Sequence, residues 1–351
     1  MRAAVLRDGE VVVRDDVAEP TPGVGQVLAA VKACGICGSD LHFVRHGAEM
    51  LELGAQMKGM PDLGDMAPPP TDLGRDVFMG HEFSAEILDV GPDTESLPVG
   101  TTVTSIPVLM GATGIEPIVY CNDIPAGYSE RILLSAPMLL EVPDGLDPRH
   151  AALTEPMAVG LHAVNRSGIE AGTGALVLGC GPVGLAVIAA LARRGIEPIV
   201  ASDFSPARRA LAETMGAHAT VDPATESAFD AWAGVSRGTP VVVFEAIGVP
   251  GILNEVLRDV PTQSKVVVVG VCMGHDSVVP LFGISKELNI QFVLGYDPLE
   301  FADSLRAIGE GEIDVTPMIT GHVGLDGVPQ AFTDLGNPEQ HCKILVEPGT
   351  Q

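Results

Sequence analysis

The pattern of apolar and polar positions divides the chain into two regions. Up to about residue 145, short apolar runs are separated by Gly and Pro, and such frequent turn signals predict a compact β-rich domain. The predicted strands cover residues 3–6, 10–13, 26–31, 83–90, 101–104 and 131–134.

After about residue 150, apolar strands alternate with helical patterns. The strands are predicted at residues 175–178, 199–202, 241–244 and 265–269. A helix is expected after the first strand, and others at 206–215 and 252–258. This alternation predicts a parallel sheet with helices on both faces. Mixed elements follow from about residue 290, with a candidate edge strand at 290–294 and a closing strand at 342–346.

Residues 44–79 interrupt the first region with little periodicity. The segment is rich in Met, Gly and Pro, including three consecutive prolines at 68–70. Loops of this length are usually functional or mobile. Two interpretations stay open: a surface excursion, or a flap that adds apolar side chains to a substrate pocket.

Composition allows two domains and predicts an acidic surface. The 351 residues are 46% apolar but only 4% aromatic, which indicates a mainly aliphatic core. With 46 Asp and Glu against 20 Lys and Arg, the net charge of −26 argues against a nucleic-acid partner, because it repels phosphate backbones. The acidity fits either a salty cytoplasm or an ordinary solubility surface.

Targeting and redox signals favour a cytoplasmic protein. No run of eighteen apolar residues is present, and residues 1–6 lack the long apolar core of a signal peptide. Scattered cysteines in a chain of this size favour reduced thiols over a disulfide framework. They are Cys34, Cys37, Cys121, Cys180, Cys272 and Cys342.

A glycine motif follows the first strand of the second region. Gly179, Gly181 and Gly184 form a G-x-G-x-x-G pattern, with Pro182 and Val183 opening the next helix. The first glycine permits a tight turn, the second lets a pyrophosphate approach the backbone, and the third allows close packing of helix on strand. The phosphates would lie at the helix N-terminus.

Asp203 decides which dinucleotide is expected. It follows Gly184 by nineteen residues at the end of the next strand, where a carboxylate accepts hydrogen bonds from ribose hydroxyls and repels a 2′-phosphate. NAD(H) is therefore favoured over NADP. Arg208 and Arg209 lie one helical turn further and weaken this preference, and Asp203 could instead cap the helix that starts near Ser205.

Three residues of metal-ligand type are the candidate catalytic centre. Cys37, His81 and Glu155 offer a thiolate, an imidazole and a carboxylate, a set that suits zinc and leaves one position open for substrate. Taken singly, each has an ordinary structural explanation in a core or at a helix start. The pair Cys34 and Cys37 also invites a redox or zinc-ribbon interpretation, but a ribbon needs a second such pair.

Five segments in this order resemble the zinc-dependent medium-chain alcohol and polyol dehydrogenases. They are residues 35–42, 80–82, 127–130, 154–164 and 177–184. The resemblance implies an α/β protein with a GroES-like β-rich catalytic domain, residues 1–147 and 290–351. A doubly wound Rossmann domain, residues 148–289, would bind the nicotinamide cofactor. Family members are dimers or tetramers that associate through the edge of the Rossmann sheet, which residues 290–294 could form, so a homo-oligomer is expected.

The resemblance also assigns roles around the metal. Cys37, His81 and Glu155 match zinc-ligand positions, where Glu155 stands at the position that holds Glu in sorbitol-type members. Glu82 resembles the carboxylate near the metal, and Asp40 the acid that orients the ligand histidine. A second, structural zinc needs four closely spaced cysteines, but residues 91–140 hold only Cys121, so one catalytic zinc per subunit is expected.

The implied reaction is hydride transfer between a secondary alcohol, diol or polyol, or the corresponding ketone or aldehyde, and NAD(H). Ser39 and His42 resemble a proton relay that runs through the cofactor ribose, with an imidazole that titrates near working pH. Two alternatives are a zinc-free, NADPH-dependent enone or quinone reductase and a non-catalytic dinucleotide-binding protein. The substrate itself is not predicted by the sequence.

Overall fold

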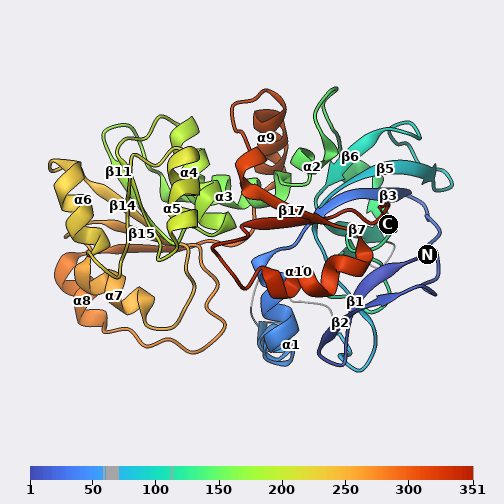
Figure 1. The fold of residues 1–351 in the computed structure, drawn as a ribbon, viewed down its shortest axis with the longest axis horizontal. Coiled ribbons are helices and arrows are strands. Elements are labelled where there is room, and N and C mark those ends of the chain that lie inside the picture. The colour runs from blue at the N-terminus through green and yellow to red at the C-terminus, as the bar shows by residue number, and fades with distance from the viewer. Residues whose placement is uncertain (58–59, 61–70, 112–113, 351) are drawn as a thin grey trace. The chain divides into compact units, whose positions relative to one another are not determined.

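The computed structural model describes residues 1–57, 60, 71–111 and 114–350, which form two compact units (Figure 1). Unit 1 comprises Met1–Glu155, Ile319–Asn337 and Lys343–Gln351, and unit 2 comprises Pro156–Met318 and Pro338–Cys342. These bounds differ from the sequence-based domains at residues 148–155, 290–318 and 338–342. The second difference arises because β16 (Asn289–Phe292) pairs with β15 (Lys265–Val268) in the sheet of unit 2.

Unit 1 contains three sheets. The largest runs in the order β10-β6-β5-β3-β18-β17, with β9 also paired to β3. The C-terminal strand β18 thus lies beside the early strand β3. The six strands predicted before residue 145 are present as β1, β2, β3, β5, β6 and β9. The strands of unit 1 are β1 (Ala3–Arg7), β2 (Glu10–Arg14), β3 (Gln26–Gly35), β4 (Val77–Phe78), β5 (Glu82–Val90), β6 (Thr102–Ser105), β7 (Val108–Gly111), β8 (Gly114–Pro117), β9 (Arg131–Ser135), β10 (Leu139–Glu141), β17 (Ile319–Val323) and β18 (Lys343–Val346).

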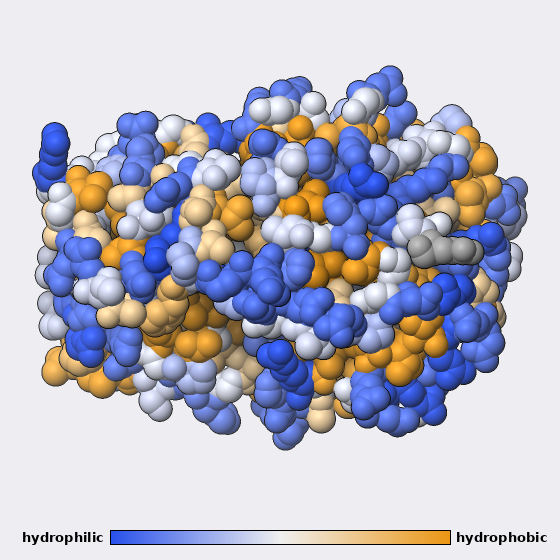
Figure 2. Space-filling model, in the orientation of Figure 1, coloured by the Kyte–Doolittle hydropathy of each residue, from blue (hydrophilic) through white to orange (hydrophobic). Residues whose placement is uncertain are grey.

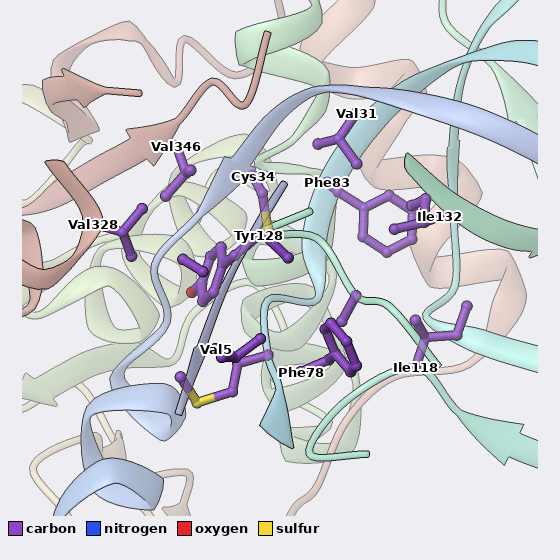
Figure 3. Packing of buried hydrophobic residues seen from close by; sticks show 14 of the residues in the cluster. Val5, Val31, Cys34, Phe78, Phe83, Ile118, Tyr128, Ile132, Val328 and Val346 are labelled. Atoms are coloured by element: carbon purple, nitrogen blue, oxygen red, sulfur yellow. The ribbon is translucent and has the colours of Figure 1, made fainter. Parts of the chain in front are cut away.

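An apolar core holds these sheets together. Val5, Phe78, Phe83, Tyr128 and Ile132 come from segments far apart in the sequence and point into one interior (Figure 3). Full burial of an aliphatic or aromatic side chain stabilises a fold by about 1.5–3 kcal/mol. The same core fixes the strand ends that carry the candidate metal ligands.

Part of the segment predicted as a long loop is a helix. Residues 44–57 belong to α1 (Gly38–Met57), which is interrupted at His46. The prediction failed there because a weakly amphipathic helix gives little periodic signal. Met79 is fully buried in the core, while residues 58–59 and 61–70, including the three prolines, lie outside the described residues. The other helices of unit 1 are η2 (Ala136–Met138), α2 (Pro148–Ala151), η4 (Leu325–Gly327) and α10 (Val328–Asp334).

Unit 2 is built around a six-stranded parallel sheet. Its order is β13-β12-β11-β14-β15-β16, which is 3-2-1-4-5-6 when β11 is counted as the first strand. This is the doubly wound order of dinucleotide-binding folds, whose ligands lie where the order reverses, beside the first strand. The remaining strands are β11 (Gly174–Leu178), β12 (Ile199–Ser202), β13 (Ala219–Val221) and β14 (Val241–Glu245).

Helices connect the strands of this sheet, as the alternating pattern predicts. The chain enters unit 2 through α3 (Thr154–Ser167), which begins in the last residues of unit 1. The others are α4 (Pro182–Arg193), α5 (Pro206–Thr214), α6 (Ala228–Ser236), α7 (Ile252–Asp259), α8 (Pro280–Lys286), α9 (Pro298–Gly309) and η3 (Thr316–Met318). Within the described ranges, no helix combines the length and apolar character needed to cross a membrane.

Candidate functional site

Cys37, His81 and Glu82 come together in unit 1. Their ligand atoms all lie within 4.8 Å of one another. Cys37 lies between the end of β3 and the start of α1, and His81 and Glu82 stand where β5 begins. Because β3 and β5 pair antiparallel, with Gly35 opposite Glu82, the sheet register itself brings these segments together.

Asp40 contacts both His81 and the backbone of Cys37. Its Oδ1 lies 3.7 Å from His81 Nδ1, and its Oδ2 accepts hydrogen bonds from the Cys37 backbone N–H at 3.1 Å and the Tyr128 hydroxyl at 2.7 Å. Asp40 is fully buried. Burial disfavours a charged imidazole, but the charges of Asp40, Cys37 and Glu155 outweigh it and raise the pKa of His81 well above its ordinary value.

Glu82 forms a buried ion pair that the sequence did not predict. Lys343 Nζ donates to both Glu82 carboxylate oxygens at 2.7 Å and to the Ile36 carbonyl at 3.1 Å. Both residues are fully buried. Gly35 leaves room for the pair, since a Cβ there would lie 2.0 Å from Glu82 Oε2. The negative charge of Glu82 is therefore already compensated by protein.

Glu155 lies in the first turn of α3. Its charge contributes to the raised pKa of His81, which indicates proximity to the cluster. Among the described residues, the group of ligand atoms within 4.8 Å of one another contains Glu82 and not Glu155. The assignment of Glu155 as the third ligand stays a prediction.

Cys34 does not share the environment of Cys37. It is fully buried on β3, where burial raises the pKa of its thiol well above the ordinary value. A buried thiol with a raised pKa forms little of the thiolate that redox exchange and metal binding require. The structure therefore gives no support to a redox role for the Cys34–Cys37 pair.

The two predicted relay residues lie near the start of α1. Ser39 Oγ accepts a hydrogen bond from the Tyr120 hydroxyl at 3.0 Å. His42, one turn further along the helix, is exposed. Partial burial and the charges of His46 and Arg45 lower the pKa of His42. Its imidazole is therefore neutral, and able to accept a proton, near neutral pH.

The donor set around Cys37 fits zinc. Sulfur, nitrogen and oxygen ligands at one place suit this ion, and two buried polar atoms there, Asp40 Oδ1 and His81 Nδ1, have no hydrogen-bond partner. Their separation of 3.7 Å is long for a hydrogen bond. A metal on the other ring nitrogen would strengthen the contact, because ligand histidines donate their second N–H to a carboxylate.

The glycine motif of unit 2 forms the loop between β11 and α4. Gly179 has a φ of +91°, and a Cβ on Gly184 would lie 1.9 Å from the Gly179 carbonyl oxygen. A Cβ on Gly181, in contrast, would meet nothing within 4 Å. Gly181 is the N-cap of α4, with Pro182 and Val183 in its first turn. The loop thus combines a tight turn, close packing and an open backbone face at a helix N-terminus.

Asp203 lies beside this loop at the end of β12. Its carboxylate accepts hydrogen bonds from the backbone N–H of Cys180 at 2.8 Å and of Ser205 at 2.9 Å. The helix N-cap is Ser205, whose side chain accepts from Arg208 N–H, so Asp203 is not the cap itself. The Arg208 guanidinium lies 3.9 Å from Asp203, and its buried Nε has no hydrogen-bond partner.

Comparison with known families and proteins shows which family the chain belongs to. Residues 23–144 match the alcohol dehydrogenase GroES-like domain, and residues 182–310 match the zinc-binding dehydrogenase domain. The chain is 32% identical to (R,R)-butanediol dehydrogenase of Bacillus subtilis over 99% of its own length and 100% of that protein. The chain belongs to the zinc-dependent medium-chain alcohol dehydrogenase family. It is also 26% identical to sorbitol dehydrogenase of the same organism, over 99% of this chain and 97% of that protein.

Solved structures of this family share the fold. The crystal structure of 2R,3R-butanediol dehydrogenase from Bacillus subtilis aligns with a TM-score of 0.81 and 30% identity over 99% of each chain. A zinc-binding dehydrogenase from Sinorhizobium meliloti, bound to NADP, aligns with a TM-score of 0.82 and 28% identity over 99% of each chain. Membership of this family identifies the chain as a zinc-type alcohol dehydrogenase and gives no support to a zinc-free reductase.

Two residues of the alcohol dehydrogenase site were not found from the sequence. Lys343 lies in an apolar terminal strand, and Tyr120 lies in a segment without periodicity. A lysine within the apolar run of the predicted closing strand at 342–346 is unusual, because lysine is almost never fully buried without a partner. That anomaly was the available signal for Lys343; no comparable signal marked Tyr120.

Proposed function

We propose that this alcohol dehydrogenase transfers a hydride between a secondary alcohol, above all a diol or polyol, and NAD. The observation that carries the proposal is the cluster of Cys37 and His81 with buried carboxylates at one end of β3 and β5. The diol preference is supported by the similarity to (R,R)-butanediol and sorbitol dehydrogenases, which are named for substrates with neighbouring hydroxyls.

One zinc ion per subunit would be held by Cys37, His81 and Glu155. Glu155 is favoured over Glu82 because both oxygens of Glu82 already accept from Lys343. Glu82 would instead remain next to the metal as a compensated charge. When bound, zinc supplies a Lewis acid that polarises an alcohol or carbonyl oxygen.

Ser39 and His42 would move the proton that accompanies hydride transfer. In the oxidation direction, the substrate hydroxyl gives its proton to Ser39 while the hydride leaves for NAD. His42, neutral and exposed near the start of the same helix, returns the proton to water. The reverse sequence supplies a proton to a ketone, so the same residues serve both directions.

NAD is the cofactor we propose, because Asp203 presents a carboxylate where a 2′-phosphate would lie. Arg208, 3.9 Å from that carboxylate, reduces but does not cancel its charge. Steady-state kinetics should give a lower KM for NAD than for NADP. Asp203→Asn should bring the two KM values closer together. Equal or better use of NADP by the wild type would contradict this assignment.

The direct test combines metal analysis with an NADH absorbance assay. The purified protein is expected to contain one zinc per subunit and to oxidise butane-2,3-diol or a polyol such as sorbitol with NAD. Activity should disappear after chelation and return with added zinc. A metal-free protein with full activity, or a zinc protein that oxidises no alcohol, would refute the proposal.

A homo-oligomer formed through unit 2 is also proposed. Strand β16 ends the six-stranded sheet, and Phe292 and Leu294 are each 64% exposed. Helix α8 adds Leu281 and Ile284, and hydrophobic side chains gather at the lower left of Figure 2, where α8 lies in Figure 1. Large exposed apolar patches mark interaction sites. Light scattering should give a dimer or tetramer, and Phe292→Lys should yield monomers.

The proposed location is the cytoplasm, because all six cysteines are free thiols. Free thiols persist in reducing compartments. Cell fractionation followed by thiol labelling tests this: recovery in an oxidising compartment, with the thiols blocked, would contradict it.

A further inference from the structure

Tyr120 is a buried phenol in direct contact with the proposed proton relay. Its hydroxyl lies 3.0 Å from Ser39 Oγ, and the residue is only 8% exposed. A phenol is more acidic than an aliphatic alcohol, so in this pair Tyr120 donates and Ser39 accepts. Serine has one hydrogen of its own and two lone pairs, and the contact occupies one lone pair.

Several contacts hold the phenol ring in this position. It stacks on Phe43, with ring centroids 4.1 Å apart and an angle of 4° between the planes. Phe43 lies on α1 four residues after Ser39, so one face of the helix supports the ring and receives the hydroxyl. The backbone is fixed as well, because Phe78 N–H donates to the neighbouring Cys121 carbonyl at 2.8 Å.

The backbone of Tyr120 is also unusual. Its φ is +54°, in the left-handed region that a bulky residue rarely adopts. Such conformations persist only where the surroundings over-determine them, and they cluster at functional sites. Phe43, Cys121 and Ser39 supply those surroundings here.

We propose that Tyr120 is a positioning residue for Ser39 in the proton relay. This inference rests on the proposed dehydrogenase function. In alcohol oxidation, the substrate hydroxyl proton forms a bond to Ser39 Oγ while the serine's own proton leaves toward His42, the next residue of the proposed relay. Tyr120 keeps its proton throughout. Its hydrogen bond aims the serine hydrogen away from the phenol and stabilises the Ser39 oxygen while that hydrogen is being exchanged.

The test compares the zinc-loaded wild type with four variants: Tyr120→Phe, Ser39→Ala, the double variant and Tyr128→Phe. Tyr120→Phe removes the hydroxyl and keeps the ring that stacks on Phe43. Its kcat with NAD and butane-2,3-diol should fall about tenfold, at the low end of what supporting residues contribute, with KM and zinc content unchanged. The solvent deuterium isotope effect on kcat should rise, which loss of packing alone would not cause.

The double variant separates positioning from structure. If Tyr120 acts through Ser39, then Tyr120→Phe should cost nothing further in a Ser39→Ala background. Tyr128→Phe is the matched comparison. Both phenols interact with Asp40, but the hydroxyl of Tyr128 donates to Asp40 and to the Gly35 carbonyl, so its loss should weaken zinc binding. The inference is overturned if Tyr120→Phe keeps the wild-type kcat. It is also overturned if the kcat of the double variant falls by the product of the two single-variant losses. A wild type that turns over no alcohol would overturn the proposed function and this inference together.

Discussion

The candidate metal site of unit 1 and the candidate dinucleotide site of unit 2 depend on opposite features: buried charges in the first and missing side chains in the second. In unit 1, Asp40, Glu82 and Lys343 place full charges in a region without solvent exposure. In unit 2, the loop after β11 depends on glycines: Gly184 packs closely against Gly179, and Gly181 leaves the backbone open. A buried charge must be compensated by a partner, whereas an open backbone must only stay uncovered. The metal site is therefore sensitive to lost polarity, and the dinucleotide site to added volume.

The same contrast holds for ion pairs within the two units. The Glu82–Lys343 pair is fully buried, while Asp303 pairs with Arg193 and Arg306 at the partly exposed surface of unit 2. Breaking a buried pair leaves an uncompensated charge, but an exposed pair is replaced by water. Four predictions test how far this contrast extends.

The largest effect is expected from the metal ligands. Cys37→Ala or His81→Ala should remove zinc and lower kcat/KM by about a thousandfold or more, because Lewis-acid polarisation supplies several kcal/mol. NADH binding, followed by fluorescence, should be largely retained. Cys34→Ala is the matched cysteine control and should keep the metal. Normal zinc content in Cys37→Ala would show that the ligand assignment is wrong.

A buried charge left alone should destabilise unit 1. Lys343→Met is expected to lower the free energy of unfolding by about 3–5 kcal/mol, because it leaves the buried Glu82 carboxylate without a partner charge. Chemical denaturation measures the change. Glu82→Gln combined with Lys343→Met should recover much of the loss, since the stranded charge is gone. Equal destabilisation in both variants would mean that packing, not charge, is decisive.

Added volume should damage the loop of unit 2. Gly184→Ala places a Cβ 1.9 Å from a carbonyl oxygen, so it should cost about 1–3 kcal/mol of stability and weaken NADH binding. Gly181→Ala is the matched control, because its Cβ meets nothing within 4 Å. It should keep the stability and lose only NADH affinity. Zinc content should be normal in both; loss of zinc from either would contradict the separation of the two sites.

The smallest effect is expected from the exposed ion pair. Hydrogen bonding to Arg193, opposed by burial and aided by Arg306, lowers the pKa of Asp303 to about 2 from 3.8. Because this pKa is lower in the folded than in the unfolded chain, the ionised Asp303 stabilises the fold at pH values above its unfolded pKa. That stabilisation is lost as the pH falls from about 4 toward 2. After screening, Asp303→Asn should cost about 1 kcal/mol or less at pH 7. If the stability difference between the wild type and Asp303→Asn were the same at pH 2 as at pH 7, the ionised carboxylate would not be its cause.

The sequence predicted unit 2 more completely than unit 1. All four predicted strands of the parallel sheet occur within one residue of their expected ends, because continuous apolar runs and glycine turns are local signals. In unit 1 the predicted strands are present, but the short strands β4, β7, β8, β10 and β17 were not predicted. Helix α1 was missed as well, because its periodicity is weak. The edge strand β16 lies where a candidate edge strand was predicted, but the predicted domain bound had placed residues 290–318 in the other domain.

What the sequence determined by itself is the inventory of chemistry. Cys37, His81, Glu155, the glycines after β11 and Asp203 were identified from residue types, their spacing and the resemblance that they carry. Only the tertiary structure decided how charges are compensated. It placed Lys343 on Glu82 and Tyr120 on Ser39, contacts that join residues 261 and 81 positions apart. Local patterns record burial and turns, but a contact across such distances depends on how the strands pair and on which side chains the core excludes from water.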